Sequence, residues 1–119
     1  MKTSLLALSL RPLVAALLSA SVCVAMAADP KASQFYEDAL ARFEKKDHAG
    51  AIIQLKNAIK IDRKMLPVHV LLGKALLANK EVVAAEVAFN EALKLGVNRA
   101  EVVVPLANAI LAQGKRQPM

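Results

Sequence analysis

Cysteine is almost absent from this 119-residue chain. The single cysteine, Cys23, lies in an apolar stretch near the N-terminus, and one thiol can neither form an intramolecular disulfide nor complete a thiolate metal site. The two histidines, His48 and His69, are separated by a whole predicted helix and have no patterned carboxylates beside them, whereas a metal site needs several ligands close together. We therefore expect no metal centre, and structural or solvent-exposed roles for both histidines.

Aromatic residues and glycine are also scarce, with no Trp, one Tyr, three Phe and four Gly. A surface that binds nucleic acid usually combines aromatic stacking platforms with a dense basic stripe. The basic residues here are interleaved with acidic ones, which is typical of a solvated helix face. The glycines are spaced one per helix or turn and form no phosphate-binding loop. These features argue against nucleic-acid binding and against a nucleotide cofactor.

Nucleophilic and acid–base groups are equally poorly placed for catalysis. Ser33 is the only serine after residue 27, and it has no neighbouring histidine that could act as its base. Glu37 and Asp38 are adjacent in the sequence, so on a helix they lie on different faces. The sequence therefore predicts a protein that is not an enzyme and that needs no cofactor.

Residues 1–27 have the pattern of a secretory signal peptide. Lys2 and Arg11 precede an apolar run, Leu13–Val24, which is shorter than the roughly 20 residues of a membrane-spanning helix. The segment ends in a small-x-small pattern, so cleavage is expected after Ala27. The remaining 92 residues would contain 14 basic and 10 acidic residues and carry a net charge of +4, because two of the 16 basic residues lie in the segment.

Two other interpretations of the N-terminus remain open. Cys23 is a candidate for lipidation, although lipoprotein signals place a small residue before the acylated cysteine and Val22 stands there. An uncleaved segment would instead anchor the chain in the inner membrane. We expect the protein to be secreted across the inner membrane, to contact a membrane only through the signal or a lipid anchor, and to lie in the periplasm or at the outer membrane.

The chain matches itself at one fixed shift, which carries Ala41 onto Ala75. The recurring residues are Ala41, Lys46, Ala51, Ala58 and Lys60, which align with Ala75, Lys80, Ala85, Ala92 and Lys94. A fixed period of this length, about 34 residues, predicts an all-α solenoid of antiparallel helix-turn-helix units that stack on one another. After a short linker, 28–32, we expect repeats over 33–66 and 67–100, a partial repeat over 101–116, and a tail, 117–119.

Apolar residues at three- and four-residue spacing predict five helices, over about 33–46, 49–62, 67–79, 83–95 and 101–113. Ser33 is expected to cap the first helix, because its hydroxyl can accept a hydrogen bond from a free amide of the first turn. Pro105 is expected in or near the first turn of the last helix, since an interior proline costs about 3 kcal/mol. Gly96 and Gly114 are expected to end the last two helices.

Small residues indicate where the two helices of one repeat cross. The expected contact pairs are Ala39 with Ala51 and Gly73 with Ala85. Only a hydrogen atom or a methyl group lets two helix backbones approach closely at such a crossing. The bulkier Leu55 and Phe89 are expected to fill the space between the helices.

The second unit resembles the tetratricopeptide repeat. The matching residues are Leu72, Gly73, Leu76, Ala85, Phe89 and Ala92, and the first unit keeps Ala51, Leu55 and Ala58. The first unit departs from the family at Asp38, where Leu is usual, and at Arg63, where Pro is usual. The resemblance covers about residues 33–116 and implies a protein or peptide partner.

In this family the first helix of each repeat lines a concave face that takes an extended peptide or a partner helix. The resemblance implies a groove lined by Tyr36, Leu40, Phe43, Glu44, Val70, Lys74, Leu77, Val104, Asn108 and Leu111. Tyr36, Lys74 and Asn108 carry polar groups that can orient a ligand. The leucine and phenylalanine side chains of this set are equally compatible with burial between helices.

Two stretches of the first repeat, FYEDAL at 35–40 and AIIQLKNAI at 51–59, carry a closer resemblance. They are similar to the first repeat of the long tetratricopeptide-repeat lipoproteins of the PEP-CTERM system, which accompany exosortase and exopolysaccharide export genes in Gram-negative bacteria. This resemblance implies a cell-envelope scaffold for exopolysaccharide export or for the sorting of PEP-CTERM proteins. Those proteins carry many repeats, so it also implies a truncated member.

An alternative function is a small periplasmic chaperone-like or self-associating module. Its evidence is the last predicted helix, which is apolar on more than one side, whereas the terminal helix of a solenoid normally has a polar outer face. Further repeats, a second protein or a second copy of the chain would each cover this surface. A homo-oligomer through the C-terminal helix is therefore among the expected assemblies.

Overall fold

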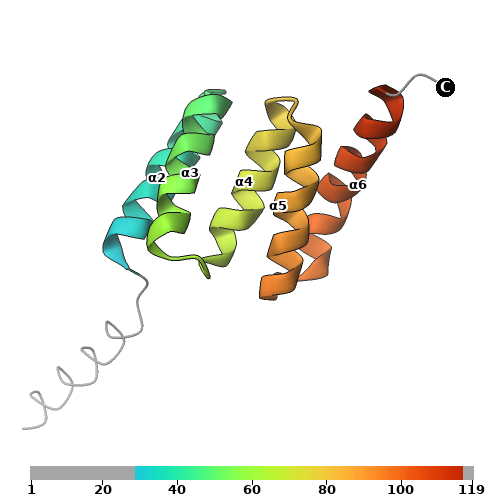
Figure 1. Cartoon of the computed structure of the whole chain (residues 1–119). Coiled ribbons are helices and arrows are strands. Elements are labelled where there is room, and N and C mark those ends of the chain that lie inside the picture. The colour runs from blue at the N-terminus through green and yellow to red at the C-terminus, as the bar shows by residue number, and fades with distance from the viewer. Residues whose placement is uncertain (1–28, 117–119) are drawn as a thin grey trace, which may run out of the picture.

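The computed structural model describes residues 29–116 and contains five helices and no strand within that range. The helices are α2 (Pro30–Glu44), α3 (His48–Ile61), α4 (Leu66–Ala78), α5 (Val82–Leu95) and α6 (Arg99–Arg116). They run alternately up and down in a row, so that each helix is antiparallel to the next (Figure 1). The predicted all-α solenoid of helix-turn-helix units is therefore confirmed.

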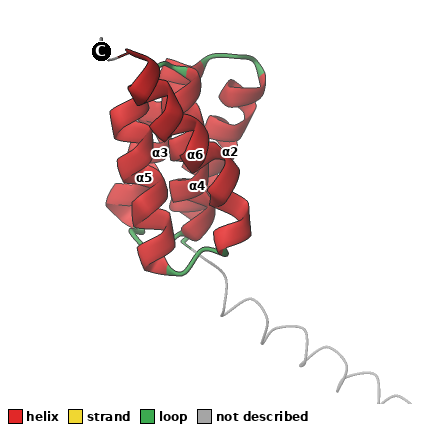
Figure 2. Ribbon diagram, turned by 90° about the vertical axis from the view of Figure 1, so that its right-hand side faces the viewer, coloured by secondary structure: helices red, strands yellow, loops and turns green. Residues whose placement is uncertain are grey.

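The helices form two layers. Helix α4 contacts α2 and α6 as well as its sequence neighbours α3 and α5. Seen from the α6 end of the row, α3 and α5 lie on one side of the molecule, and α2, α4 and α6 lie on the other (Figure 2). The first helices of successive repeats therefore lie side by side, which allows residues of α2, α4 and α6 to contribute to one surface.

The turn inside each repeat has the same geometry. Lys46 has a φ of 70°, and Lys80, at the equivalent position of the second repeat, has a φ of 68°. In the first turn the amide of Asp47 donates to the carbonyl of Arg42 at 2.8 Å, and the equivalent bond recurs in the second turn. The sequence period therefore corresponds to a repeated backbone conformation, in which a left-handed residue closes the first helix of the pair.

Gly96 ends α5, as predicted. Its φ of 108° lies in the left-handed region, and the amide of Val97 donates to the carbonyl of Ala92 at 3.0 Å. Glycine suits this position because it has no Cβ to clash with the backbone at positive φ.

The prediction that Ser33 caps the first helix is wrong. Helix α2 begins at Pro30, so residues 30–32, which were expected in a linker, form its first turn. The cap is Asp29, whose carboxylate accepts a hydrogen bond from the amide of Lys31 at 2.8 Å. Pro30 favours this earlier start because its fixed φ suits the first helical position, where its missing N–H costs nothing.

The predictions for Pro105 and Gly114 are also wrong. Helix α6 begins at Arg99 because the side chain of Asn98 accepts a hydrogen bond from the amide of Ala100 at 2.8 Å. Pro105 therefore lies inside the helix, where it cannot donate to the carbonyl of Glu101. Gly114 does not end the helix, which continues to Arg116. Its φ is not positive, so nothing in its backbone conformation requires a glycine.

The core fills the space between the layers. The four small residues that were expected at the helix crossings, Ala39, Ala51, Gly73 and Ala85, are all buried. Leu55 and Phe89 are fully buried, as expected of the residues that fill the space between helices. A Cβ atom on Gly73 would lie 2.6 Å from Cδ1 and 2.7 Å from Cζ of Phe89. The absence of a side chain at Gly73 therefore makes room for the Phe89 ring, and this contact locks α4 against α5.

The predicted signal peptide, its cleavage position after Ala27, the lipidation candidate Cys23 and the tail 117–119 all lie outside the described residues. Among residues 29–116, no helix combines the length and the hydropathy that crossing a membrane would require.

Candidate protein-binding groove

A hollow of about 730 Å³ lies where α2, α4 and the turn between α5 and α6 meet. Its lining consists of Tyr36, Leu40, Leu66, Pro67, Val70, Leu71, Lys74, Gly96, Val97, Asn98 and Glu101. We call this hollow the α2–α4 groove. It contains four of the ten residues that the sequence predicted for a partner-binding groove: Tyr36, Leu40, Val70 and Lys74.

Helix geometry aligns the residues of the first two walls. Tyr36 and Leu40 are four residues apart on α2, and Leu66, Val70 and Lys74 are spaced by four along α4. Residues at this spacing lie one above the other on the same face of a helix. Val70 is buried and forms part of the apolar floor, whereas Lys74 is exposed and places an ammonium group at the rim.

The third wall was missed by the sequence reasoning. Gly96, Val97 and Asn98 form the turn, and Glu101 follows on the first turn of α6. Val97 is buried in the core and thereby holds the turn against α4, while Asn98 and Glu101 are exposed. Gly96 was recognised as a helix end, but only the folded contact between α4 and α6 brings the turn to the groove.

The charged and polar groups of the groove lie on different elements. Lys74 belongs to α4, and Glu101 to α6. An apolar floor with a cation and an anion among its lining residues can bury apolar side chains of a ligand and also orient its polar groups.

The remaining predicted groove residues lie elsewhere. They are Phe43, Glu44, Leu77, Val104, Asn108 and Leu111, and none of them lines the α2–α4 groove. Phe43 and Leu77 are half-buried and pack against the core. The other four are exposed, and Val104 and Leu111 belong to the side of α6 that faces away from the row.

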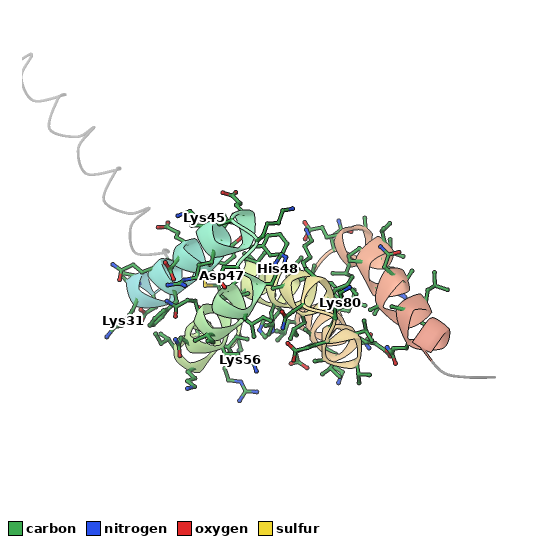
Figure 3. All side chains as sticks on the ribbon, turned by 90° about the horizontal axis from the view of Figure 1, so that it is seen from above. Lys31, Lys45, Asp47, His48, Lys56 and Lys80 are labelled. Carbon is green, nitrogen blue, oxygen red and sulfur yellow. The ribbon has the colours of Figure 1, made fainter. Side chains whose placement is uncertain are left out.

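Phe43 has a specific neighbour in the first turn of α3. The ring centroids of Phe43 and His48 are 5.3 Å apart, with a tilt of 60°. Nδ1 of His48 is buried without a hydrogen-bond partner. Figure 3 shows His48 beside Asp47 at the turn that joins α2 to α3. The ring therefore packs at this turn, which is the structural one of the two roles that the sequence left open for His48.

His69 also has a structural role. It is buried, and its Nε2 lies 2.8 Å from the carbonyl oxygen of Arg63. This contact ties α4 to the turn that precedes it, beside a second hollow of about 490 Å³ between α3, α4 and α5. Within residues 29–116, no three His, Cys, Asp or Glu side chains are grouped closely enough to hold a metal ion.

A polar network covers the N-terminal end of the row. Oδ2 of Asp38 accepts from Nε of Arg42 at 2.7 Å and from Nε2 of Gln54 at 2.7 Å. Arg42 also donates to Oδ2 of Asp47 at 3.1 Å. The hydrogen bonds from Arg42 and then from Gln54 lower the pKa of Asp38 below its ordinary value, and the bonds to Asp38 and Asp47 raise the pKa of Arg42.

This network explains the departure of the first repeat from the family pattern. Asp38 stands where the second repeat has Leu72, and Arg42 stands where it has Leu76. Leu72 and Leu76 are buried, whereas Asp38 and Arg42 are half-exposed. The first repeat therefore presents polar side chains at the two positions where the second repeat has buried leucines.

The chain was compared with known protein families and with curated proteins. A family described as tetratricopeptide repeat matches residues 42–103, which is more than half of the chain. No curated protein matches the sequence. Repeats of this family generally mediate protein–protein interactions, and the fold is typically a non-catalytic scaffold. Together with the two stacked helix pairs and the first helix of a third, this match shows that the chain belongs to the tetratricopeptide repeat family.

Proposed function

We propose that this protein is a non-catalytic interaction scaffold of the bacterial cell envelope and that it binds a protein segment in the α2–α4 groove. The observation that carries this proposal is the groove itself, because three elements converge on an apolar floor with charged and polar side chains beside it. A site of this construction suits an extended peptide or a partner helix.

The groove residues suggest how a segment would be held. Val70, Leu71 and Val97 form a floor that is already packed into the core, so apolar side chains of the ligand would meet a preformed surface. Lys74 and Glu101 lie on different elements and would pair with an acidic and a basic group of the ligand. Such pairs favour one direction of the bound chain, because the reversed direction places like charges together.

The envelope location rests on residues 1–27 and on the resemblance of the first repeat. We propose that the segment directs secretion across the inner membrane and that the mature chain acts in the periplasm or at the outer membrane. Within that compartment we propose a role in exopolysaccharide export or in the sorting of PEP-CTERM proteins, because the stretches 35–40 and 51–59 resemble proteins of that system. Cys23 is the candidate lipid anchor.

Photo-crosslinking in living cells tests the groove. A photoreactive amino acid at Lys74 should yield a crosslinked protein, and the same photoreactive amino acid at Lys56 should not. Lys56 lies on α3, and Figure 3 shows it on the opposite side of the molecule from Lys45 of α2, the helix that forms one wall of the groove. A Glu101→Arg variant should reduce the crosslink from Lys74, while Glu37→Arg, at an exposed site of α2 outside the groove, should leave it unchanged. Equal crosslinking from Lys74 and Lys56 would contradict the proposal.

The intact mass of the protein from an envelope fraction tests the proposed location. A chain that begins at residue 28 indicates cleavage after Ala27, and a chain that begins at Cys23 with attached acyl groups indicates a lipoprotein. A full-length protein found only in the cytosolic fraction would contradict secretion.

A further inference from the structure

The outer side of α6 carries an exposed apolar stripe. The residues are Ala100, Val103, Val104, Ala107, Ile110 and Leu111, and all six are exposed. Their spacing of three and four residues places them along one side of the helix. Helix α6 stands at the end of the row in Figure 1, and no element within residues 29–116 packs on this side of it. We call this set the outer stripe.

The rest of the molecule holds α6 in an orientation that keeps the outer stripe exposed. Val102 and Ala109 are fully buried on the opposite side of the helix. Gln113 donates from its side-chain amide to Oε2 of Glu86 on α5. Helix α6 therefore cannot turn about its axis to bury the stripe without exposing Val102 and Ala109 and breaking this bond. An apolar surface held in this way is a typical protein interaction site.

The centre of the outer stripe matches a helix crossing elsewhere in the chain. Ala39, Gly73 and Ala107 occupy the same position in three successive units of the repeat. Gly73 and Ala39 are buried, each in a helix that packs on an antiparallel partner, α5 or α3. Ala107 also has a small side chain but is exposed. The stripe is thus suited to another antiparallel helix at close range.

The two ends of the row differ in character. The N-terminal end carries the network of Asp38, Arg42 and Gln54, which keeps that face polar. The outer stripe has no charged residue. Of the two ends of the row, the α6 end is therefore the one whose outer face is apolar.

The order of residues in the outer stripe identifies what covers it. Counted outward from Ala107, a large aliphatic residue occurs three and four positions away on each side, and a small residue occurs seven positions away on each side, because Gly114 mirrors Ala100. An antiparallel copy of the same helix would therefore place Val103 against Leu111 and Val104 against Ile110 of its partner. A surface that complements itself in this way generates a closed two-fold dimer.

We infer that two copies of the chain form a dimer in which the outer stripes pack antiparallel, with the two-fold axis at Ala107. The inference is independent of the proposed function, because none of the residues of the outer stripe lines the α2–α4 groove. Antiparallel packing also brings the helix dipoles into a favourable arrangement. The dimer leaves the groove of each copy open to a partner.

Sedimentation of the full chain tests the dimer with a matched pair of variants. Val104 is 65% exposed on α6 and Val83 is 63% exposed on α5. Because each substitution occurs twice in the dimer, Val104→Lys should raise the dissociation constant by on the order of a hundredfold, whereas Val83→Lys should leave it unchanged. The Val83→Lys variant also controls for association through residues 1–28, which both variants retain.

Cysteine crosslinking tests the register in a Cys23→Ser background. Ala107→Cys should form a disulfide with its own copy, because residue 107 meets itself on the axis. Ala100→Cys should not, since the two copies of residue 100 would be about 21 Å apart at 1.5 Å per residue, far beyond the reach of a disulfide. A mixture of Ala100→Cys and Gly114→Cys chains should crosslink.

The outcomes separate the inference from its alternatives. A concentration-dependent dimer that Val104→Lys dissociates, with crosslinking at Ala107 and in the mixture, supports it. A monomer at all concentrations, a larger assembly, or a dimer that is equally sensitive to Val83→Lys overturns it. If Val104→Lys does not fold, the crosslinking pattern alone decides, and efficient disulfide formation by Ala100→Cys chains alone refutes the two-fold arrangement.

Discussion

The contact between Gly73 and the Phe89 ring leads to the sharpest stability prediction. In Gly73→Ala the new Cβ would meet Cδ1 and Cζ of Phe89 at 2.6 and 2.7 Å, whereas ordinary contacts lie at 3.4–4 Å. The ring must therefore move by about 1 Å in a core where Phe89 is fully buried. Overpacking of this kind costs about 1–3 kcal/mol. Alanine recovers about 0.5–1 kcal/mol through its higher helix propensity, so we expect a net loss of about 1–2 kcal/mol.

Gly114→Ala is the matched control, because it makes the same substitution on a helix with nothing within 4 Å of the new Cβ in a single copy of the chain, and both variants are compared at a concentration where the chain is monomeric. There only the propensity gain remains, and it should stabilise the protein by up to about 0.5–1 kcal/mol. Urea denaturation followed by circular dichroism measures both changes. For a domain of this size 1 kcal/mol corresponds to about 4–8 °C in Tm, so the two variants should shift in opposite directions.

A double-mutant cycle with Phe89→Leu isolates the clash. Removing the ring should cost about 1–2 kcal/mol by itself, but Gly73→Ala should then no longer destabilise. The coupling energy between positions 73 and 89 should equal the overpacking cost of about 1–3 kcal/mol, because the helix-propensity gain is the same with or without the ring. If Gly73→Ala stabilises the protein as much as Gly114→Ala does, or if the two positions show no coupling, the proposed packing of α4 on α5 is incorrect.

Two further predictions concern the first repeat. Lys46→Gly should stabilise the protein by about 0.5–1 kcal/mol. A φ of 70° strains any L-residue by about 1–2 kcal/mol, and glycine removes this strain, but glycine also raises the conformational entropy of the unfolded chain, which cancels part of the stabilisation. Lys45→Gly, where φ is −87°, should destabilise instead, and urea midpoints of the two variants would refute the assignment if both moved the same way. Asp38→Asn should lower stability at about pH 7 and have progressively less effect as the pH falls. The folded state lowers the pKa of Asp38, chiefly through its hydrogen bond with Arg42, so its contribution is present above the ordinary value of 3.8 and is lost as the pH falls through the folded pKa. An Asp38→Asn effect that is constant across this range would contradict the role of the ion pair.

The helical pairing was predictable because it follows from residues close together in the sequence. Ala39, Gly73 and Ala107 recur at one fixed interval. This period indicates on which face the first helix of each repeat must carry a small side chain. Helix ends were harder to predict, because several local signals compete. Ser33 and Asp29 are both suitable caps, and Pro30 decided in favour of the earlier start. Pro105 was placed near a helix start because an interior proline is costly, but Asn98 caps α6 earlier in the chain, so Pro105 lies inside the helix.

The sequence predicted only those residues of the candidate groove whose alignment follows from their spacing within one helix. Tyr36 with Leu40, and Val70 with Lys74, are pairs at four-residue spacing, and the structure brings all four together. The third wall depends on how the turn at Gly96 folds back against α4, which no local pattern specifies. Asp38 was recognised as a departure from the family, but its partner Gln54 lies 16 residues further along, so its role required the fold.

The central claim is that a partner protein binds in the α2–α4 groove, and a map of photo-crosslinking yield over the surface tests it most directly. The photoreactive residue would be placed in turn at Leu40, Pro67 and Asn98 in the groove, and at Ile53 and Val83 on α3 and α5. Ile53 and Val83 are apolar and are 61% and 63% exposed, against 36% for Leu40, so crosslinks from them report non-specific hydrophobic adhesion. The account predicts that one partner crosslinks from the three groove positions, including Asn98, and not from the other two. Yields concentrated at Ile53 and Val83 would contradict it.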